Sequence, residues 1–392
     1  MTYDFDQFID RRSSDSSKWR RYDQDVLPLW VADMDFPSPE PVIQALRERV
    51  EHSIFGYGIE PRELRSVIVD RLLRLYGWQV APESIVFVPG VVAGFNLACR
   101  AVASPNGGVL MQTPIYHPML AAPGNARLTR EEAQLMRRED GHYEVGFDAL
   151  ESAFTSLTRL YILCNPHNPV GRVFQRQELE RIADMCLRHN VVICSDEIHC
   201  DLLFSGSTHI PIASLAPEVA ERTITLMAPS KTFNTPGLRC SMAIIQNQEL
   251  RQKFEAARTG IVPGVNLMGF AAALAAYKYG QPWLDEVLHY LENNRDFLVD
   301  YVNERLPGVT AVRPEATYLA WLDCSHSRIS GNPHQFFLQE ARVALNDGCA
   351  FGRGGEGFVR LNFACPRSLL TEGLHRMKKA LMGLDHLDPG QQ

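Results

Sequence analysis

The stretch 223-TITLMAPSKTFN-234 places one lysine, Lys231, directly after a short apolar run with the composition of a buried strand. Pro229 and Ser230 precede the lysine, so rigid and small residues surround its backbone. Most lysines are solvated surface groups, but a lysine among apolar residues has a depressed pKa and can act as a nucleophile and general base. The stretch therefore predicts a reactive amine at the carboxyl end of a strand.

Short apolar runs recur on both sides of this stretch and alternate with longer amphipathic segments. In the segment 177–189, for example, Leu179, Ile182 and Cys186 fall on one face of a helix. Parallel strands covered by helices on both faces give this alternation, so the middle of the chain is predicted to be a doubly wound α/β sheet. The predicted strands span residues 84–88, 109–112, 160–164, 191–195, 223–227 and 242–245.

The last third of the chain changes character. A long helical pattern over 283–306 is ended by Pro307 and Gly308 and marks the passage into a second domain. Two further strands and a closing helix follow, and the last five residues are predicted to be frayed. These elements are expected at 318–323, at 358–363, from 367 onward and at 388–392.

Length and composition limit the classes of function. The chain has 392 residues, enough for two domains with a site between them, and its 45% hydrophobic and 22% charged residues are typical of a globular protein. Its net charge is −7 and its basic residues are scattered, so it lacks the clustered positive charge that is typical of a nucleic-acid-binding protein. We therefore expect a small-molecule role.

Compartment follows from the cysteines and the N-terminus. The nine cysteines are odd in number and lack the paired short spacings of zinc and redox motifs, which indicates a reducing cytoplasm, with residues such as Cys164 and Cys194 as small buried hydrophobes. The N-terminus has no apolar signal region, and no stretch approaches the roughly 18 apolar residues of a membrane span. We expect a soluble protein that is not exported.

The turns after the predicted strands carry most of the polar chemistry. Ligands of open α/β sheets bind beyond the carboxyl ends of the strands. After 84–88 comes 89-PGVVAG-94 and then a helical pattern, an arrangement that points free backbone N–H groups at a phosphate. Such a turn taken alone is more often only a turn. Arg239, eight residues after Lys231, has a planar fork that suits phosphate.

Two more turns offer amides and carboxylates. The turn 165-NPHNPVG-171 presents Asn165 and Asn168 between prolines that fix the backbone. The turn 196-DEIH-199 puts Asp196 at the end of a buried strand, where a carboxylate is costly without a cation such as a protonated pyridine nitrogen. A helix N-cap or a structural salt bridge explains Asp196 equally well when it is considered by itself.

Taken in order, these turns resemble those of fold type I pyridoxal 5'-phosphate (PLP) enzymes of the class I and II aminotransferase family, across nearly the whole chain. The resemblance implies an α/β fold with a large domain, built on a mostly parallel seven-stranded sheet, and a smaller α+β domain. We expect an N-terminal segment 1–45 that contributes to the small domain, a large PLP-binding domain 46–280 and a small C-terminal domain 281–392.

The same resemblance implies roles around the cofactor ring. Lys231 of S-K-T-F-N becomes the lysine that holds PLP as a Schiff base, and Asp196 of D-E-I-H becomes the partner of the pyridine nitrogen. Asn168 of H-N-P-V-G is expected to hydrogen-bond the phenolic oxygen of the cofactor. Tyr116 of T-P-I-Y-H-P is expected to stack on the ring.

It also implies roles for the phosphate and the substrate. The phosphate is expected on the N–H groups of Val91 and Val92, with Ser230 and Arg239. Tyr57 of F-G-Y-G is similar to the family tyrosine that reaches a phosphate in the neighbouring subunit, which implies a homodimer. Arg360 of G-F-V-R-L-N matches the arginine that grips the α-carboxylate of the substrate; its apolar neighbours disfavour a surface arginine.

A narrower resemblance is to the cystathionine β-lyase, or MalY/PatB-type C–S lyase, branch of the family. The run 27-LPLWVADMDFP-37, D-E-I-H-C-D-L and A-T-Y-L-A-W-L-D carry it. His199, which we expect beside the cofactor, fits this branch, whereas Arg239 departs from it. Substrate contacts are expected from Ala32, Asp33, Tyr116, Asn168 and Arg360, with residues 30–36 and 349–356 shaping the pocket.

Three functions remain open at this level. The first is a PLP-dependent C–S β-lyase that releases thiol, pyruvate and ammonia from cystathionine or another cysteine conjugate, including sulfoxides. The second is an aminotransferase, which Arg239 favours. The third is a MalY-like regulatory protein that works by binding a partner, against which the intact Lys231, Asp196 and Arg360 argue.

Two other motifs predict no site. The run 352-GRGGEG-357 matches G-x-G-x-x-G, but it precedes a predicted strand and opens no helix, so it fails the context of a dinucleotide-binding turn. His199 with Asp196 and Asp201 lacks a second histidine or a cysteine at ligand spacing, so we expect no metal.

Overall fold

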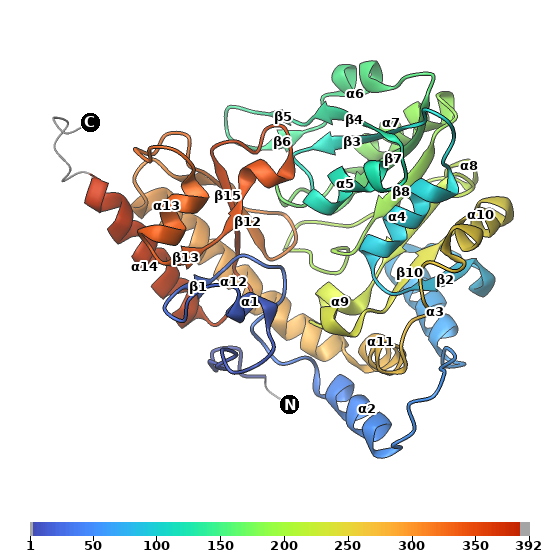
Figure 1. Cartoon of the computed structure of the whole chain (residues 1–392), viewed down its shortest axis with the longest axis horizontal. Helices are drawn as coiled ribbons and strands as arrows, with labels where there is room; N and C mark the ends of the chain where they lie inside the picture. Colours follow the sequence, from blue (N-terminus) through green and yellow to red (C-terminus); the bar gives the residue numbers. More distant parts are fainter. Residues whose placement is uncertain (1–2, 385–392) are drawn as a thin grey trace.

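The computed structural model describes residues 3–384, which form two main sheets surrounded by helices (Figure 1). The larger sheet has seven strands in the order β2-β10-β9-β8-β7-β3-β4. Of these seven strands only β10 runs against its neighbours, so the sheet is mostly parallel, as predicted. The strands are β2 (Ile85–Val88), β3 (Gly108–Thr113), β4 (Thr129–Gln134), β7 (Thr158–Cys164), β8 (Val192–Asp196), β9 (Thr223–Met227) and β10 (Ser241–Ile244).

Helices cover both faces of this sheet. Along β7, Leu160 and Ile162 join the apolar cluster under one set of helices, while Tyr161 and Leu163 join the cluster under the other. Strands buried on both faces are apolar throughout, which is why they were readable in the sequence. The first face is covered by α4 (Val91–Ala101), α5 (His117–Asn125) and α10 (Gln248–Arg258). The second face is covered by α6 (Phe147–Ala153) and α7 (Arg176–Arg188). On this second face, the strands β2 and β10 are covered by α3 (Leu64–Tyr76) and α11 (Leu267–Tyr279).

The second sheet is antiparallel, with four strands in the order β11-β12-β15-β14. The 25-residue helix α12 leads from the large sheet to this one, and its buried residues share a core with those of the sheet and of α14. The elements are α12 (Gln281–Arg305), β11 (Thr310–Ala311), β12 (Leu319–Asp323), α13 (Pro333–Gln339), β14 (Asn346–Asp347), β15 (Phe358–Asn362) and α14 (Arg367–Leu384).

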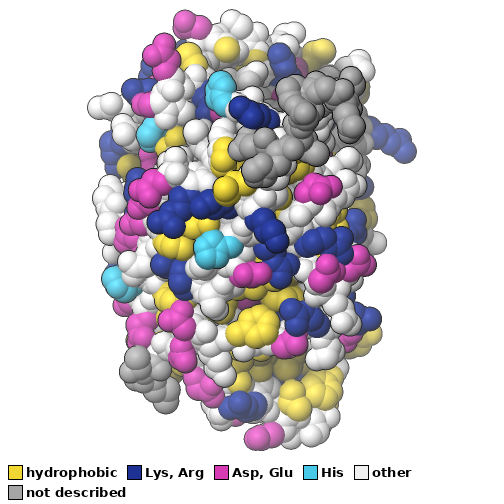
Figure 2. Space-filling view, turned by 90° about the vertical axis from the view of Figure 1, so that its left-hand side faces the viewer, with side chains coloured by type: hydrophobic (Ala, Val, Ile, Leu, Met, Phe, Trp, Pro, Cys, Tyr) yellow, Lys and Arg dark blue, Asp and Glu magenta, His cyan; other side chains and the backbone are white. Residues whose placement is uncertain are grey.

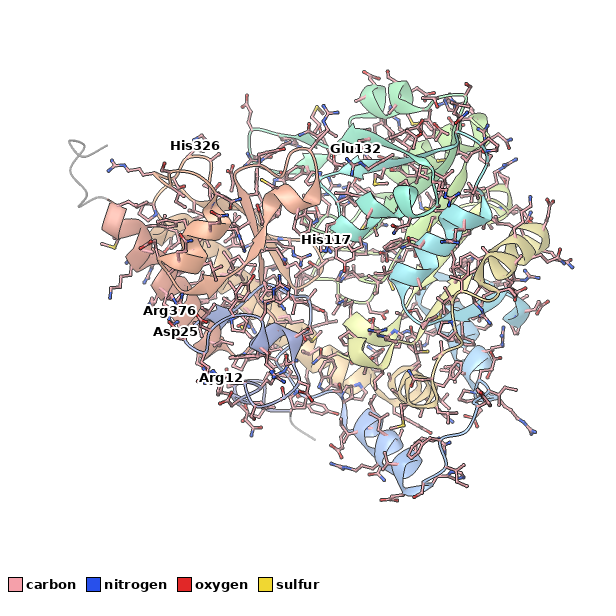
Figure 3. All side chains as sticks on the ribbon, viewed as in Figure 1. Arg12, Asp25, His117, Glu132, His326 and Arg376 are labelled. Atoms are coloured by element: carbon pink, nitrogen blue, oxygen red, sulfur yellow. The ribbon has the colours of Figure 1, made fainter. Side chains whose placement is uncertain are left out.

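The N-terminal segment lies against this second sheet (Figure 1). Its strand β1 (Leu27–Pro28) pairs in parallel with β13 (Val343–Ala344). Arg342 forms ion pairs with Asp23 and Asp25, and Arg376 on α14 donates a hydrogen bond of 2.7 Å to the carbonyl of Asp25 (Figure 3). The segment then runs into α2 (Glu40–Glu51), which packs on α11.

The sequence predicted six of the seven strands of the large sheet and missed β4. This strand, TREEAQ, lies at the edge of the sheet and is largely exposed, so it lacks the apolar signature of its neighbours. The long helix, both later strands and the closing helix are confirmed within a few residues. The tail 388–392 lies outside the described residues.

The surface and the cysteines complete the description. On the face shown in Figure 2, lysine and arginine side chains are interspersed with acidic ones. No helix within residues 3–384 combines the length and the apolar composition that a membrane crossing needs. All nine cysteines are free thiols and eight of them are buried, which confirms Cys164 and Cys194 as small buried hydrophobes.

Candidate active site

A cavity of about 780 Å³ opens where the large sheet meets the second one. Its walls are the turns that follow β2, β3, β7, β8 and β9, together with residues of β14, β15 and the N-terminal segment. Of the residues predicted for the site, eleven line it: Ala32, Val91, Val92, Tyr116, Asn168, Asp196, His199, Ser230, Lys231, Arg239 and Arg360. The fold thus brings together residues that are as far as 328 positions apart.

Lys231 reaches into this cavity from α9 (Pro229–Thr232), a single turn after β9. Its amine donates a hydrogen bond of 2.6 Å to the carbonyl oxygen of Ala32. Burial lowers its pKa to about 8; Asp33 and Asp196 oppose this shift, and Arg360 adds to it. An amine with this pKa is partly neutral near neutral pH, as a nucleophile and general base requires.

Asp196 is the last residue of β8 and is 4% exposed. One carboxylate oxygen accepts a hydrogen bond of 3.1 Å from the backbone N–H of Ile198. Burial raises its pKa to about 7, although that N–H and Lys231 lower it. The carboxylate thus lies on the cavity wall without an ion pair within the described residues, and it is suited to a cationic ring nitrogen of a ligand.

The start of α4 forms one end of the cavity. Gly90 precedes the helix with φ of 123°, a conformation that residues with a Cβ rarely adopt, and Val91, Val92 and Ala93 of the first turn line the wall. The first N–H groups of a helix have no partner inside it, so they are available to an anion. Ser230 and Arg239 line the same cavity.

Arg360 on β15 is 2% exposed and donates hydrogen bonds to two side-chain amides. Its Nη1 lies 2.8 Å from Oδ1 of Asn168, and its Nη2 lies 2.6 Å from Oδ1 of Asn346. Its buried Nε has no partner, and burial lowers its pKa to about 10. This guanidinium lacks a carboxylate partner among the described residues, which is the state of a site built for an external carboxylate.

His199 and Tyr116 add ring surfaces to the cavity. His199 is 3% exposed, and its Nδ1 is buried without a hydrogen-bond partner. Burial, with the charges of Lys231 and Arg360, lowers the pKa of His199 to about 3, so the imidazole is neutral. Tyr116 stands immediately before α5.

Two predicted site residues lie elsewhere. Tyr57 is fully exposed, in the loop between α2 and α3, and does not line the cavity. Asp33 is not among the lining residues either, because its carboxylate forms ion pairs with Arg11 and Lys18. Direct contact of Asp33 with a substrate stays a prediction.

Trp30, from the stretch predicted to shape the pocket, lines the cavity. The structure also adds residues that had no assigned role: Asn346 lines the cavity, and Tyr318 donates a hydrogen bond of 3.0 Å to the carbonyl of Ala32. Figure 3 shows His117 at the start of α5, where it lines the same cavity. No local signal marks Asn346, whereas Trp30 and Tyr318 stand inside motifs that carry the lyase resemblance.

The loop 349–356 contributes less than expected. It does not line the cavity, and its Phe351 packs beneath Arg360, with the guanidinium carbon 4.9 Å from the ring centre. The G-x-G-x-x-G run ends at Gly357, directly before β15, and opens no helix. The run therefore lacks the following helix that a dinucleotide-binding turn needs.

PLP fits this cavity on three observations. Among the described residues the buried carboxylate of Asp196 has no cation paired with it, the first N–H groups of α4 have no partner inside the helix, and Lys231 brings its amine into the same cavity. The unpartnered Nδ1 of His199 is a further polar atom that a bound group can satisfy. The residues present therefore suit a phosphorylated pyridine aldehyde.

Comparison with known proteins extends this result. The model of the family "Aminotransferase class I and II" matches residues 24–377. The chain is 40% identical to cystathionine β-lyase PatB of Bacillus subtilis (strain 168) over 388 residues, which is 96% of this chain and 99% of that protein.

Solved structures agree on the fold. The crystal structure of OvoB is 45% identical with a TM-score of 0.92, covering 97% of this chain and 99% of that one. The PLP-bound C–S lyase of Staphylococcus hominis is 35% identical with a TM-score of 0.91, covering 97% and 98%. The predicted fold class is confirmed, and the chain belongs to the class I and II aminotransferase family.

Proposed function

We propose that this protein is a PLP-dependent carbon–sulfur β-lyase that cleaves cystathionine or another cysteine S-conjugate. The observation that carries the proposal is one cavity that holds a lysine amine, a carboxylate without a counter-ion and a buried arginine without a carboxylate. Names of relatives support the reaction type, since PatB is a cystathionine β-lyase and the S. hominis protein is a C–S lyase.

Each residue has a defined task toward the cofactor. Lys231 would hold its aldehyde carbon until the amino group of the substrate takes the place of the lysine and frees its amine, and Asp196 would keep the ring nitrogen protonated. The first turn of α4, with Ser230 and Arg239, holds the phosphate. The amide of Asn168 donates to the phenolic oxygen, since its own oxygen already accepts from Arg360, and Tyr116 and His199 contact the ring.

Arg360 places the substrate. Its fork binds the α-carboxylate in two parallel hydrogen bonds. Binding there brings Cα of the substrate toward Lys231, which lines the same cavity. The neutral amine of Lys231 then removes the Cα proton.

The bond changes that follow balance without an oxidant. When bound, PLP supplies the conjugated ring that accepts the electrons left at Cα. A double bond forms between Cα and Cβ, the C–S bond breaks, and the sulfur leaves with its electron pair and takes a proton. Water hydrolyses the released enamine, so cystathionine and water give homocysteine, pyruvate and ammonia.

A homodimer with Tyr57 acting across the interface belongs to this proposal. Tyr57 is fully exposed, and its neighbours Ile54, Phe55 and Ile59 are between 61% and 85% exposed. A cluster of large apolar side chains at the surface is typical of a contact with another protein. A second copy that covers this loop receives Tyr57 at its own phosphate site. A cytoplasmic location is part of the proposal and is supported by the nine free thiols.

The deciding experiment supplies L-cystathionine, S-alkyl cysteines and their sulfoxides, separately, to the purified protein loaded with PLP. Pyruvate and thiol are assayed with no keto acid present. Release of both supports the lyase and ranks the substrates. Absence of pyruvate, followed by amino transfer once a keto acid is added, assigns the protein to the aminotransferases, which share the residues named above.

A further inference from the structure

Residues 30–36 are here called the strap; its first three residues, Trp30, Val31 and Ala32, line the cavity. The carbonyl of Ala32 accepts from Lys231 at 2.6 Å and from the hydroxyl of Tyr318 at 3.0 Å. The carbonyl of Trp30 accepts from Arg360 at 3.3 Å. The strap therefore touches both the reactive amine and the arginine of the site.

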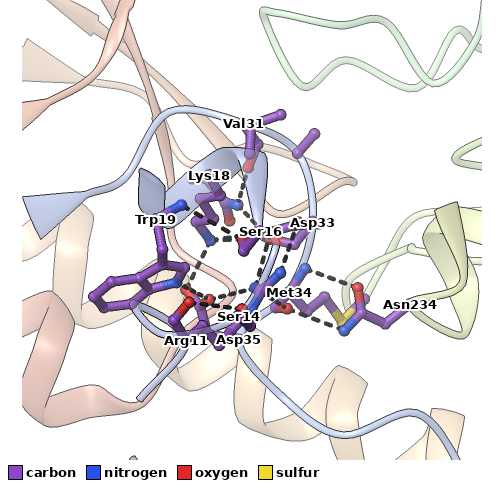
Figure 4. A network of polar contacts seen from close by, with 12 residues as sticks. Arg11, Ser14, Ser16, Lys18, Trp19, Val31, Asp33, Met34, Asp35 and Asn234 are labelled. Carbon is purple, nitrogen blue, oxygen red and sulfur yellow. Dashed lines mark hydrogen bonds and ion pairs between the residues drawn. The ribbon is translucent and has the colours of Figure 1, made fainter. Parts of the chain in front are cut away.

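A buried cluster of two cations and two carboxylates holds the strap (Figure 4). Nζ of Lys18, whose side chain is 0% exposed, lies 2.7 Å from Oδ2 of Asp35 and 3.4 Å from Oδ1 of Asp33. Nη1 of Arg11 lies 2.7 Å from Oδ1 of Asp35, and its Nη2 lies 3.2 Å from Oδ2 of Asp33. The indole of Trp19 donates to Asp35 at 2.8 Å.

The strap is also tied to the turn that carries Lys231. Asn234, three residues beyond the lysine, accepts from the N–H of Met34 at 3.0 Å and donates to the carbonyls of Met34 and Phe36 at 3.0 and 2.8 Å (Figure 4). Asn362 donates to the carbonyls of Val31 and Asp33 at 2.6 and 2.7 Å. The backbone of the strap thus has one fixed position relative to the lysine.

The two carboxylates of the cluster differ in what they face. The side chain of Asp35 is 3% exposed and is enclosed by Arg11, Lys18 and Trp19. The side chain of Asp33 is 19% exposed, and its charge raises the pKa of Lys231 against the lowering by burial. The other charges that act on the lysine are Arg360 and Asp196.

We propose that Asp33 is a positioning residue for Lys231 and not a substrate ligand: its carboxylate, fixed by Arg11 and Lys18, holds the carbonyl of Ala32 against the amine of the lysine. The inference rests on the proposed function only in that Lys231 is taken as the reactive amine. Proton transfer by the amine needs both of its protonation states, so a residue that sets their balance shapes catalysis without touching the substrate.

The test compares Asp33→Asn with Asp35→Asn in the full chain, first without cofactor or substrate. The rate at which Lys231 reacts with an amine-directed reagent, followed on its peptide by mass spectrometry across pH 6 to 11, gives its pKa. We expect Asp33→Asn to lower this pKa by roughly half a unit to one unit and Asp35→Asn to leave it unchanged. We expect Asp35→Asn to lower the melting temperature more than Asp33→Asn does, since the side chain of Asp35 is the more enclosed.

Two further variants guard against loss of folding. Asp33→Glu keeps the charge and is expected to retain the wild-type pKa of Lys231. Arg12→Gln removes an exposed pair with Asp10 and a contact of 5.5 Å between the guanidinium carbon and the centre of the Trp19 ring, but no charge that acts on the lysine, so it is expected to leave the pKa of Lys231 unchanged (Figure 3). An unchanged pKa in Asp33→Asn, or equal shifts in Asp33→Asn and Asp35→Asn, overturns the inference.

The PLP-loaded enzyme separates this inference from the proposed function. If Asp33 binds the substrate, Asp33→Asn raises KM and leaves the pKa of Lys231 in the cofactor-free protein as it was, which contradicts the inference. If the protein is not a lyase, pyruvate is absent in every variant, while the comparison of lysine pKa values still stands.

Discussion

The carboxylates of Asp196 and Glu197 are neighbours in the chain but lie in opposite environments. Glu197 is fully buried and accepts hydrogen bonds from His209 at 2.8 Å, from Ser195 at 2.8 Å and from the N–H of Ile212 at 3.3 Å. Asp196 faces the cavity and receives one backbone N–H. Successive residues of an extended chain point to opposite faces, so one carboxylate stabilises the fold and the other is left for a ligand.

The first prediction concerns the stability of the cofactor-free protein with pH. Because burial raises the pKa of Asp196 to about 7, the folded state binds this proton more tightly than the unfolded state. Its contribution is therefore fully present below about pH 4 and is lost as pH rises to about 7, by up to about 4 kcal/mol. Asp196→Asn removes this dependence.

The measurement is the melting temperature of wild type and Asp196→Asn at pH 5 and pH 8, without cofactor. We expect the melting temperature of the variant, relative to that of the wild type, to be higher at pH 8 than at pH 5. Other groups titrate alike in both proteins, so the difference isolates Asp196. If the melting temperatures of the two proteins differ by the same amount at both pH values, the carboxylate of Asp196 is not uncompensated in the folded protein, and the prediction is wrong.

The second prediction is that Glu197→Ala destabilises the protein by about 3 to 5 kcal/mol, because it leaves the buried His209 without its partner. Denaturant unfolding of the cofactor-free chain measures the loss. Glu249→Ala, which removes a surface pair with Lys253 on α10, is the control and should cost less than about 1 kcal/mol.

The third prediction is that Lys231→Ala folds normally but loses at least about 10²-fold in turnover, because the amine that moves the Cα proton is gone. Pyruvate release and circular dichroism measure the two properties. Lys253→Ala, at the surface, serves as the control and should keep full activity. Wild-type turnover in Lys231→Ala would contradict the proposed mechanism.

The fourth prediction is that Arg360→Lys raises KM for cystathionine by about 10- to 100-fold, with a smaller effect on kcat. Lysine keeps the charge but cannot form two parallel hydrogen bonds with a carboxylate. Steady-state kinetics provide the test. Arg313→Lys, on an exposed loop paired with Asp300, is the control, and an unchanged KM in Arg360→Lys argues against a carboxylate subsite.

The fifth prediction tests whether Tyr57 acts in the partner's site. We expect Tyr57→Phe to weaken retention of PLP, and mixed dimers of Tyr57→Phe with Lys231→Ala to contain one intact site. In such a dimer the Tyr57→Phe chain supplies the lysine and the other chain supplies the tyrosine.

Activity recovered after the two variants are unfolded together and refolded measures this complementation. Each variant refolded alone is the control. If Tyr57 serves its own chain, no site in the mixed dimer is intact and recovery does not exceed that of the controls.

Much of the site was readable in the sequence because it is made of turns. Lys231, Asp196 and Asn168 each follow an apolar strand, and a strand buried on both faces is recognisable from composition alone. Since parallel strands end at one edge, the sequence order of the turns was enough to predict that these residues converge. The exposed edge strand β4 was missed because its charged residues carry no such signal.

Short-range apolar patterns and turn residues specify the sheet, the lysine and its companions at the strand ends, so these were predictable without the fold. Three contacts of the site were not: Ala32 presents its carbonyl to Lys231, Asn346 joins Arg360, and Arg11 and Lys18 engage Asp33. Those contacts join residues from 14 to 199 positions apart. The contacts of Ala32 and Asp33 depend on how the N-terminal segment packs, and that of Asn346 depends on the pairing of β14 with β15; no local pattern encodes either arrangement.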